Sequence, residues 1–117
     1  MSATPQPRPY PAQMPDSETL RLADLVSYQP GTVVSRILLK HAHGNVTIFA
    51  FDARQGLTEH TAAFDALVQV LDGRAEITIS DKPVQVSAGE AILLPANQPH
   101  ALAALTPFKM LLTMIRS

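Results

Sequence analysis

Histidine is the residue of this 117-residue chain whose chemistry is most informative, because imidazole can bind a transition metal, carry a proton near neutral pH or hydrogen-bond a ligand. The chain has four histidines, His41, His43, His60 and His100. It has no cysteine, which excludes disulfides, thiolate metal ligands and a cysteine nucleophile. No serine-nucleophile motif, phosphate-binding loop or zinc-finger spacing is present. The histidines are therefore the first candidates for a functional site.

His41 and His43 form a His-x-His pair, a spacing often seen in metal ligands. The pair comes directly before Gly44 and Asn45, two residues typical of a tight turn between strands. We therefore expect His41 and His43 at a solvated hairpin tip, outside any binding site.

The elements that must position the other two histidines are strands. The five glycines fall between short runs of β-branched residues and mark turns. Short strands joined by hairpins, with no room for crossover helices, predict an all-β sandwich or closed barrel, and periodicity alone does not choose between them. The predicted strands lie near 32–40, 45–53, 57–62, 66–71, 75–80, 83–87, 90–94 and 100–115, the last being two strands broken around Thr106 and Pro107.

The N-terminal region has a different character from the rest of the chain. Residues 1–15 contain five of the ten prolines, which disfavour both helix and regular strand pairing, so we expect a flexible, extended arm. Asp16 and Ser17 are possible caps before a group of leucines, so residues 16–28 are expected to form a short helix or a turn-rich lead-in. Residues 16–117 are predicted to form a single domain.

Two motifs favour the closed barrel. Residues 56–73 run from Gly56 through His60 to Gly73 and resemble the first cupin motif, in which a glycine leads to His-x-His, a glutamate and a closing glycine. Residues 89–100 resemble the second cupin motif, which ends in a histidine, with Asn97 in place of the usual glycine; asparagine tolerates the positive φ of that position. The resemblance to the small single-domain cupins of bacteria covers about residues 30–117. It implies a double-stranded β-helix, or jelly-roll barrel.

The resemblance also implies where a site lies. In the cupin family, three histidines and one glutamate converge on a divalent metal inside the barrel. His60 and His100 match the first and last histidines, whereas Ala62 and Ala66 stand at the positions of the second histidine and the glutamate. Both alanines are expected on the same face as His60, since side chains two apart on a strand share a face. Two imidazoles can hold Fe, Mn, Ni or Zn only weakly, with water or a ligand completing the shell.

Other side chains near the motifs are weaker candidates. Glu59 and Gln69 alternate to the opposite face, and Asp65 is expected to stabilise a turn rather than to replace the missing glutamate. The bulky apolar residues are expected mainly in the core. Among them, Met110 and Met114 are predicted to share one face with Leu112 and to line a pocket with His60 and His100. The four phenylalanines are Phe49, Phe51, Phe64 and Phe108.

Composition limits the classes of function. The net charge is -1, with nine basic and ten acidic residues spread along the chain, which argues against a nucleic-acid partner. Neither a signal peptide nor a membrane-spanning run is recognisable, so a soluble cytoplasmic protein is expected. Only 16% of the residues are charged. This deficit suggests surface buried in a homodimer, through the apolar strand near Val33 to Leu39.

Three functional hypotheses follow. The favoured one is a barrel that binds an unknown small molecule, with His60 and His100 as its polar groups, holding a carboxylate or phenolate when one ring is charged or shuttling a proton. The second is a metal-dependent enzyme, resembling a dioxygenase or an isomerase, with a two-histidine site completed by water or ligand. The third is a sensory or regulatory module.

Overall fold

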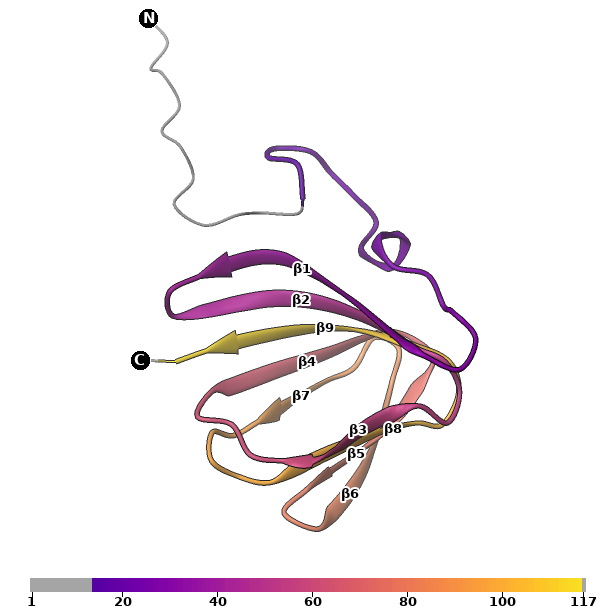
Figure 1. Cartoon of the computed structure of the whole chain (residues 1–117), viewed down its shortest axis with the longest axis vertical. Coiled ribbons are helices and arrows are strands. Elements are labelled where there is room, and N and C mark those ends of the chain that lie inside the picture. Colours follow the sequence, from indigo (N-terminus) through magenta and orange to yellow (C-terminus); the bar gives the residue numbers. More distant parts are fainter. Residues whose placement is uncertain (1–13, 117) are drawn as a thin grey trace, which may run out of the picture.

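The computed structural model describes residues 14–116, which form nine strands and one short 3-10 helix. The predicted all-β class is confirmed, and the predicted break near Thr106 and Pro107 separates the last two strands (Figure 1). In chain order the elements are η1 (Leu22–Leu25), β1 (Val33–His41), β2 (Gly44–Phe51), β3 (Gly56–His60), β4 (Asp65–Asp72), β5 (Arg74–Ile79), β6 (Lys82–Ser87), β7 (Ala91–Leu94), β8 (His100–Ala104) and β9 (Phe108–Ile115).

The strands form two antiparallel sheets that face each other and close into a jelly-roll barrel (Figure 1). One sheet has the strand order β1-β2-β9-β4-β7 and the other has the order β3-β8-β5-β6. The chain passes between the sheets at Gly73, whose φ of 75° favours glycine. A Cβ atom there would lie 2.0 Å from the carbonyl oxygen of Pro107, so a larger residue would also clash with the backbone.

Alternation along the strands decides which side chains enter the barrel. In β4, Ala66, Val68 and Val70 are buried between the sheets, whereas Leu67 and Gln69 are exposed on the outer face. The barrel core therefore follows from the period-two pattern of the sequence. It consists of Phe51, Ala66, Val68, Val70, Ala75, Ile77, Val86, Leu94, Leu102, Ala104, Phe108 and Met110.

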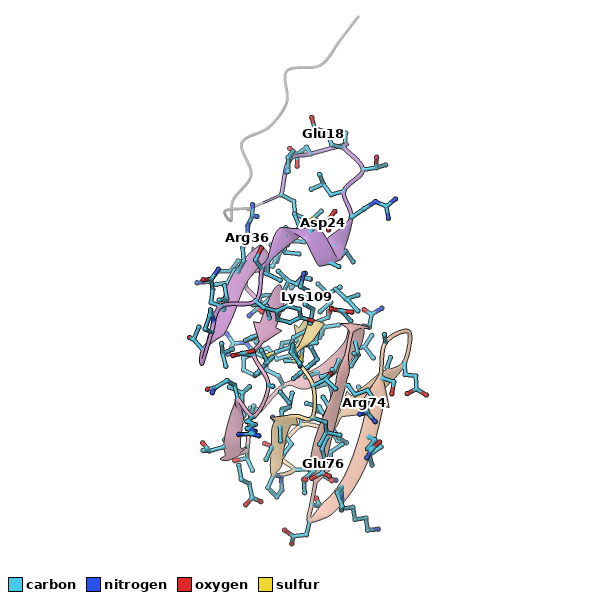
Figure 2. The ribbon with its side chains drawn as sticks, turned by 90° about the vertical axis from the view of Figure 1, so that its right-hand side faces the viewer. Glu18, Asp24, Arg36, Arg74, Glu76 and Lys109 are labelled. Atoms are coloured by element: carbon cyan, nitrogen blue, oxygen red, sulfur yellow. The ribbon has the colours of Figure 1, made fainter. Side chains whose placement is uncertain are left out.

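A second, smaller core lies on the outer face of the five-stranded sheet. Val26, Leu38, Ile48 and Ala50 are buried there, under the segment that contains η1. The Lys109 ammonium donates a hydrogen bond of 2.6 Å to the carbonyl oxygen of Ala23. The lead-in that the sequence predicts for residues 16–28 thus contains one helical turn and packs on the barrel (Figures 1 and 2).

Tyr28 fixes the end of this lead-in to the barrel. Its hydroxyl group donates a hydrogen bond of 2.5 Å to the carboxylate of Asp72 in β4. Burial, and then the hydrogen bond and charge of Asp72, raise the pKa of Tyr28 well above its ordinary value. The protonated phenol is therefore the form that the folded state favours.

The arm predicted over residues 1–15 lies outside the described residues except at its end, where Met14 packs against the second core.

β1 is an edge strand of the larger sheet, and its side chains Ile37 and Leu39 are exposed. The homodimer that we expect through this strand stays a prediction. In the described part of the chain, no helix is long and apolar enough to cross a bilayer.

Candidate functional site

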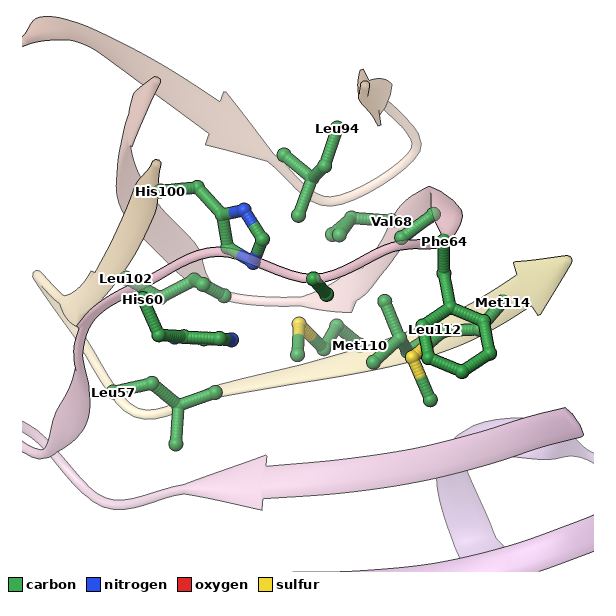
Figure 3. Close-up of a pocket in the computed structure, with 12 residues that line it drawn as sticks. Leu57, His60, Phe64, Val68, Leu94, His100, Leu102, Met110, Leu112 and Met114 are labelled. Carbon is green, nitrogen blue, oxygen red and sulfur yellow. The ribbon is translucent and has the colours of Figure 1, made fainter. Parts of the chain in front are cut away.

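A pocket opens into the barrel between the two sheets, with a cavity of about 60 Å³ (Figure 3). Its wall comes from β3, β4, β7, β8, β9 and the loop between β3 and β4. Apart from two imidazoles, the lining side chains are aliphatic, aromatic or thioether groups. The twelve lining residues are Leu57, His60, Ala62, Phe64, Ala66, Val68, Leu94, His100, Leu102, Met110, Leu112 and Met114.

The structure brings His60 and His100 together on neighbouring strands of the smaller sheet. His60 ends β3 and His100 begins β8, and the two residues are directly paired in the ladder. Their ring centroids lie 4.4 Å apart with the planes inclined at 66°. His100 is buried, whereas His60 is exposed at the pocket mouth. The convergence of the two rings that the motif positions imply is therefore present in the fold.

An irregularity in β3 shapes this side of the pocket. The register of the β3-β8 ladder shifts between Leu57 and His60. Residues three apart on a regular strand point to opposite faces, but both of these side chains line the pocket. The shift thus lets Leu57 form part of the wall while His60 faces His100.

Backbone hydrogen bonds set the tautomer of both rings. The Nδ1 atom of His60 lies 2.9 Å from the carbonyl oxygen of Thr58, and that of His100 lies 3.2 Å from the carbonyl oxygen of Gln98. A carbonyl oxygen only accepts hydrogen bonds, so Nδ1 carries the proton in each neutral ring. Nε2 is then left with an unprotonated lone pair in each ring. Figure 3 shows the two rings directed into the pocket, where these lone pairs are available to a ligand.

Ala62 and Ala66 line the pocket on the same side as the imidazoles, as the strand pattern predicts. Their methyl groups occupy positions where the motif would have ligand side chains. The two motifs are also joined through the backbone, because the N–H of Asn97 donates a hydrogen bond of 2.7 Å to the carbonyl oxygen of Ala62. Asn97 has a φ of 66°, the left-handed conformation expected for a residue that replaces glycine.

The nearby carboxylates and the other histidines lie elsewhere. Asp65 accepts a hydrogen bond of 3.0 Å from the backbone N–H of Ala96, which is the turn-stabilising role predicted for it. Glu59 is exposed and absent from the pocket wall. His41 and His43 are exposed where the β1-β2 hairpin turns, as predicted. Within residues 14–116, no group of three or more histidine, aspartate or glutamate side chains is placed to hold a metal ion.

Met110 and Met114 both line the pocket, on the face of β9 that the alternation predicts. Figure 3 shows the Met110 sulfur on the side of the two rings and the Met114 sulfur near Phe64 at the other side. Whether these residues bind a ligand stays a prediction.

Four further wall residues were not identified from the sequence, Leu57, Val68, Leu94 and Leu102. Strand alternation from Ala66 and His100 would have found Val68 and Leu102. Leu94 enters the wall because β7 pairs with β4 opposite Ala66, a partner that the sequence does not reveal.

Comparison with known proteins identifies the family. The sequence profile of the cupin domain matches residues 47–115, more than half of the chain. The chain belongs to the cupin family. Among curated proteins, no match was found.

Several solved structures share the cupin fold of this chain. A conserved protein of unknown function from Streptococcus pyogenes is 32% identical, covers 96% of this chain and 98% of its own length, and superimposes with a TM-score of 0.90. A cupin superfamily protein from Desulfitobacterium hafniense is 27% identical over 89% of this chain and 95% of its own, with a TM-score of 0.84. A cupin 2 conserved barrel domain protein from Leptotrichia buccalis is 42% identical over 83% of this chain and 47% of its own, with a TM-score of 0.80.

The donor set of this cupin barrel does not fit the divalent metal that is common in the family. Catalytic metal sites of this kind normally have three or four protein ligands, often including a carboxylate. The pocket has two imidazoles, and no carboxylate is among its lining residues. A divalent ion would keep most of its charge uncompensated against an apolar wall.

Proposed function

We propose that this cupin binds a small, largely apolar molecule that carries one acidic or hydrogen-bond-donating group. The observation that carries the proposal is the pair of Nε2 lone pairs, held side by side in a pocket whose other lining groups are apolar. A lone pair on Nε2 accepts a hydrogen bond from a donor on the ligand, and such a bond contributes about 1.5–3 kcal/mol when one partner is charged.

The size of the cavity limits the ligand. One water-sized group needs about 10–15 Å³, so a cavity of about 60 Å³ accepts about four to six such groups without movement of the wall. Met110 and Met114 have flexible side chains that can adapt to a somewhat larger molecule. A short branched carboxylic acid has a suitable size, an apolar body and one acidic group.

A carboxylic acid binds such a pair in a defined protonation state. The carboxylate anion has no proton to donate, so its complex with two Nε2 lone pairs requires one added proton. That proton resides on one imidazole or on the acid, and either arrangement gives a charge-assisted or strong neutral hydrogen bond. When both imidazoles are neutral, binding of the anion is therefore accompanied by uptake of one proton from the buffer.

A divalent-metal enzyme is the less favoured function. Fe, Mn, Ni or Zn bound to His60 and His100 would depend on water or a ligand for its remaining positions, which gives weak binding. The apolar wall offers no carboxylate to act as a general base or to balance the charge. The binding function needs neither a metal nor a further catalytic group.

Calorimetric titration of tag-free protein with isobutyrate tests the proposal. At a mildly alkaline pH, where imidazole is neutral, measurements in two buffers of different ionisation enthalpy are expected to show uptake of one proton per bound molecule. His60→Ala and His100→Ala should each weaken binding by about 10- to 100-fold, the usual range for a hydrogen bond to a charged group. His43→Ala is the matched control and should have no effect, since His43 lies at the exposed hairpin tip.

Isobutyronitrile has the same carbon skeleton but has no negative charge and takes up no proton, so it cannot form the charge-assisted hydrogen bond and should bind more weakly than isobutyrate. Equal binding of the two compounds, or isobutyrate binding without proton uptake, would contradict the assignment of the ligand class. Circular dichroism of each variant establishes that the barrel is intact.

A further inference from the structure

We propose that the same pocket contains a binding site for a soft monovalent metal ion, Cu(I), with the Nε2 atoms of His60 and His100 and the thioether sulfur of Met110 as its three ligands. The proposal does not rest on binding of an organic molecule, because these three side chains are sufficient to hold the ion. It joins the two motif histidines to Met110 in β9, a ligand that the cupin motifs do not contain.

The two nitrogen ligands are already arranged for a shared ion. Metal–imidazole bonds are about 2 Å long, so one ion can contact two rings only if they are neighbours. The centroids of His60 and His100 are 4.4 Å apart. Each Nδ1 atom is engaged by a backbone carbonyl group, which orients the ring and leaves Nε2 unprotonated, as in most histidine ligands of metals.

The third ligand comes from β9. Met110 is only 1% exposed, and its side chain lines the same pocket as the two imidazoles. Figure 3 shows its sulfur on the side of the pocket where the rings lie. The side chain has three rotatable bonds, so the sulfur can adjust its position without movement of the strand.

Charge and softness both favour a monovalent ion over the divalent ions usual in the family. Thioether sulfur is a soft ligand that selects Cu(I), whereas carboxylates suit harder ions. The position at which the motif would have a glutamate is Ala66, so the pocket supplies no negative charge. Because the cost of burying a charge rises with its square, a single charge is far less costly than two in this apolar wall.

Met114 provides a control within the same pocket. It lies on the same strand face as Met110 and lines the same cavity. Its sulfur lies near Phe64, at the opposite side from the rings (Figure 3). Replacing either methionine by leucine keeps the apolar volume and removes only the sulfur, a type of substitution that usually costs less than about 1.5 kcal/mol.

The test is an anaerobic titration with Cu(I) in competition with the chromophoric chelator bicinchoninate. The protein carries no affinity tag and has the His43→Ala substitution, which removes the exposed His-x-His pair as a competing site. We expect one Cu(I) per chain. Met110→Leu should lower the Cu(I) affinity by about tenfold or more, and Met114→Leu should leave it within about twofold.

Two further readouts separate ligation from a structural effect. X-ray absorption of the copper-loaded protein should show one sulfur neighbour of the metal, and this signal should be lost in Met110→Leu and retained in Met114→Leu. Zn(II) affinity should be lower than that of Cu(I) and unchanged by Met110→Leu, because two imidazoles alone hold it.

Failure of the parent protein to bind Cu(I), or equal losses for Met110→Leu and Met114→Leu, would overturn the proposal. A higher affinity for Zn(II) than for Cu(I) would overturn it as well. Isobutyrate binding is measured on the same parent protein and does not require a sulfur ligand, so a parent that binds isobutyrate but not Cu(I) shows failure of the metal site without failure of the proposed function.

Discussion

The barrel interior has two regions of different character, a packed region around Phe51 and Phe108 and a pocket region around His60 and His100. The phenylalanine rings stack with centroids 4.5 Å apart, and both side chains are fully buried. The imidazoles lie at a similar separation but face a cavity. β9 contributes side chains to both regions, Phe108 to the packed region and Met110, Leu112 and Met114 to the pocket region.

One region is filled and the other contains a cavity because their inward-pointing side chains differ in volume, and not because the alternation along the strands differs. The same alternation directs side chains inward in both, so the pattern of the sequence is continuous along β9. At the pocket, Ala62 and Ala66 contribute only methyl groups where larger side chains would fill the space. The packed region is also closed from outside, because the lead-in hydrogen-bonds to Asp72 and Lys109 beside Phe108.

The largest expected effect is the loss of stability in Phe108→Ala. Removing a fully buried aromatic ring from the packed region should lower the free energy of unfolding by about 3–5 kcal/mol, from lost burial and from the cavity created. Equilibrium unfolding in urea measures this change.

Met114→Ala is the matched comparison in the pocket region. Its side chain is only half-buried and already borders a cavity, so its truncation should cost clearly less than that of Phe108. Equal losses would show that the interior is uniformly packed and that the two regions are not distinct.

The next effect in size is a gain of divalent-metal binding in Ala62→His. The substitution returns a third imidazole to the pocket, which is the number found in many catalytic zinc sites. Added Zn(II) should then raise the stability by about 2.7 kcal/mol at a free concentration 100-fold above Kd. Thermal unfolding with and without Zn(II) measures the gain, and the parent protein at the same concentration is the control. An identical shift in both proteins would show that the missing imidazole does not limit divalent binding.

The smallest effect concerns Tyr28, which helps to close the packed region. The pKa of Tyr28 is raised in the folded protein, by burial and then by Asp72, so the unfolded chain releases this proton at a lower pH than the folded chain does. The stabilisation is therefore complete below the ordinary tyrosine pKa of about 10 and decreases as the pH rises above it.

Tyr28→Phe should cost about 1 kcal/mol near neutral pH, through loss of the hydrogen bond to Asp72. It should also make the decline of stability above about pH 10 less steep. Urea unfolding of both proteins across this pH range is the measurement. An equally steep decline of the free energy of unfolding in both proteins would show that Tyr28 does not cause it.

Much of the fold can be predicted from the sequence because turns and alternation are local properties. The glycines and the break near Pro107 locate the strand ends, and the alternation in β4 separates Ala66 and Val68 from Leu67 and Gln69. The packing of the lead-in against Ile48 and Ala50 is not predictable in this way. It depends on contacts between residues far apart in the chain.

The site is partly predictable for the same reason. The motif spacing leads to His60, His100, Ala62 and Ala66, and alternation leads to Met110 and Met114. The place of Leu57 in the pocket wall cannot be predicted, because it results from the register shift in β3. The place of Leu94 depends on which strand pairs with β4. The Nδ1 hydrogen bonds that leave both Nε2 atoms unprotonated arise from backbone conformation, about which the residue types say nothing.

The central claim is that His60 and His100 present two unprotonated Nε2 atoms to one apolar pocket, and the tautomers can be measured directly. Long-range proton–nitrogen correlation spectra of the imidazole rings distinguish a proton on Nδ1 from one on Nε2. At mildly alkaline pH, the account predicts the Nδ1-protonated form for both His60 and His100. Exposed His43 should show the Nε2-protonated form that predominates in water. An Nε2 proton on either His60 or His100 would contradict the account.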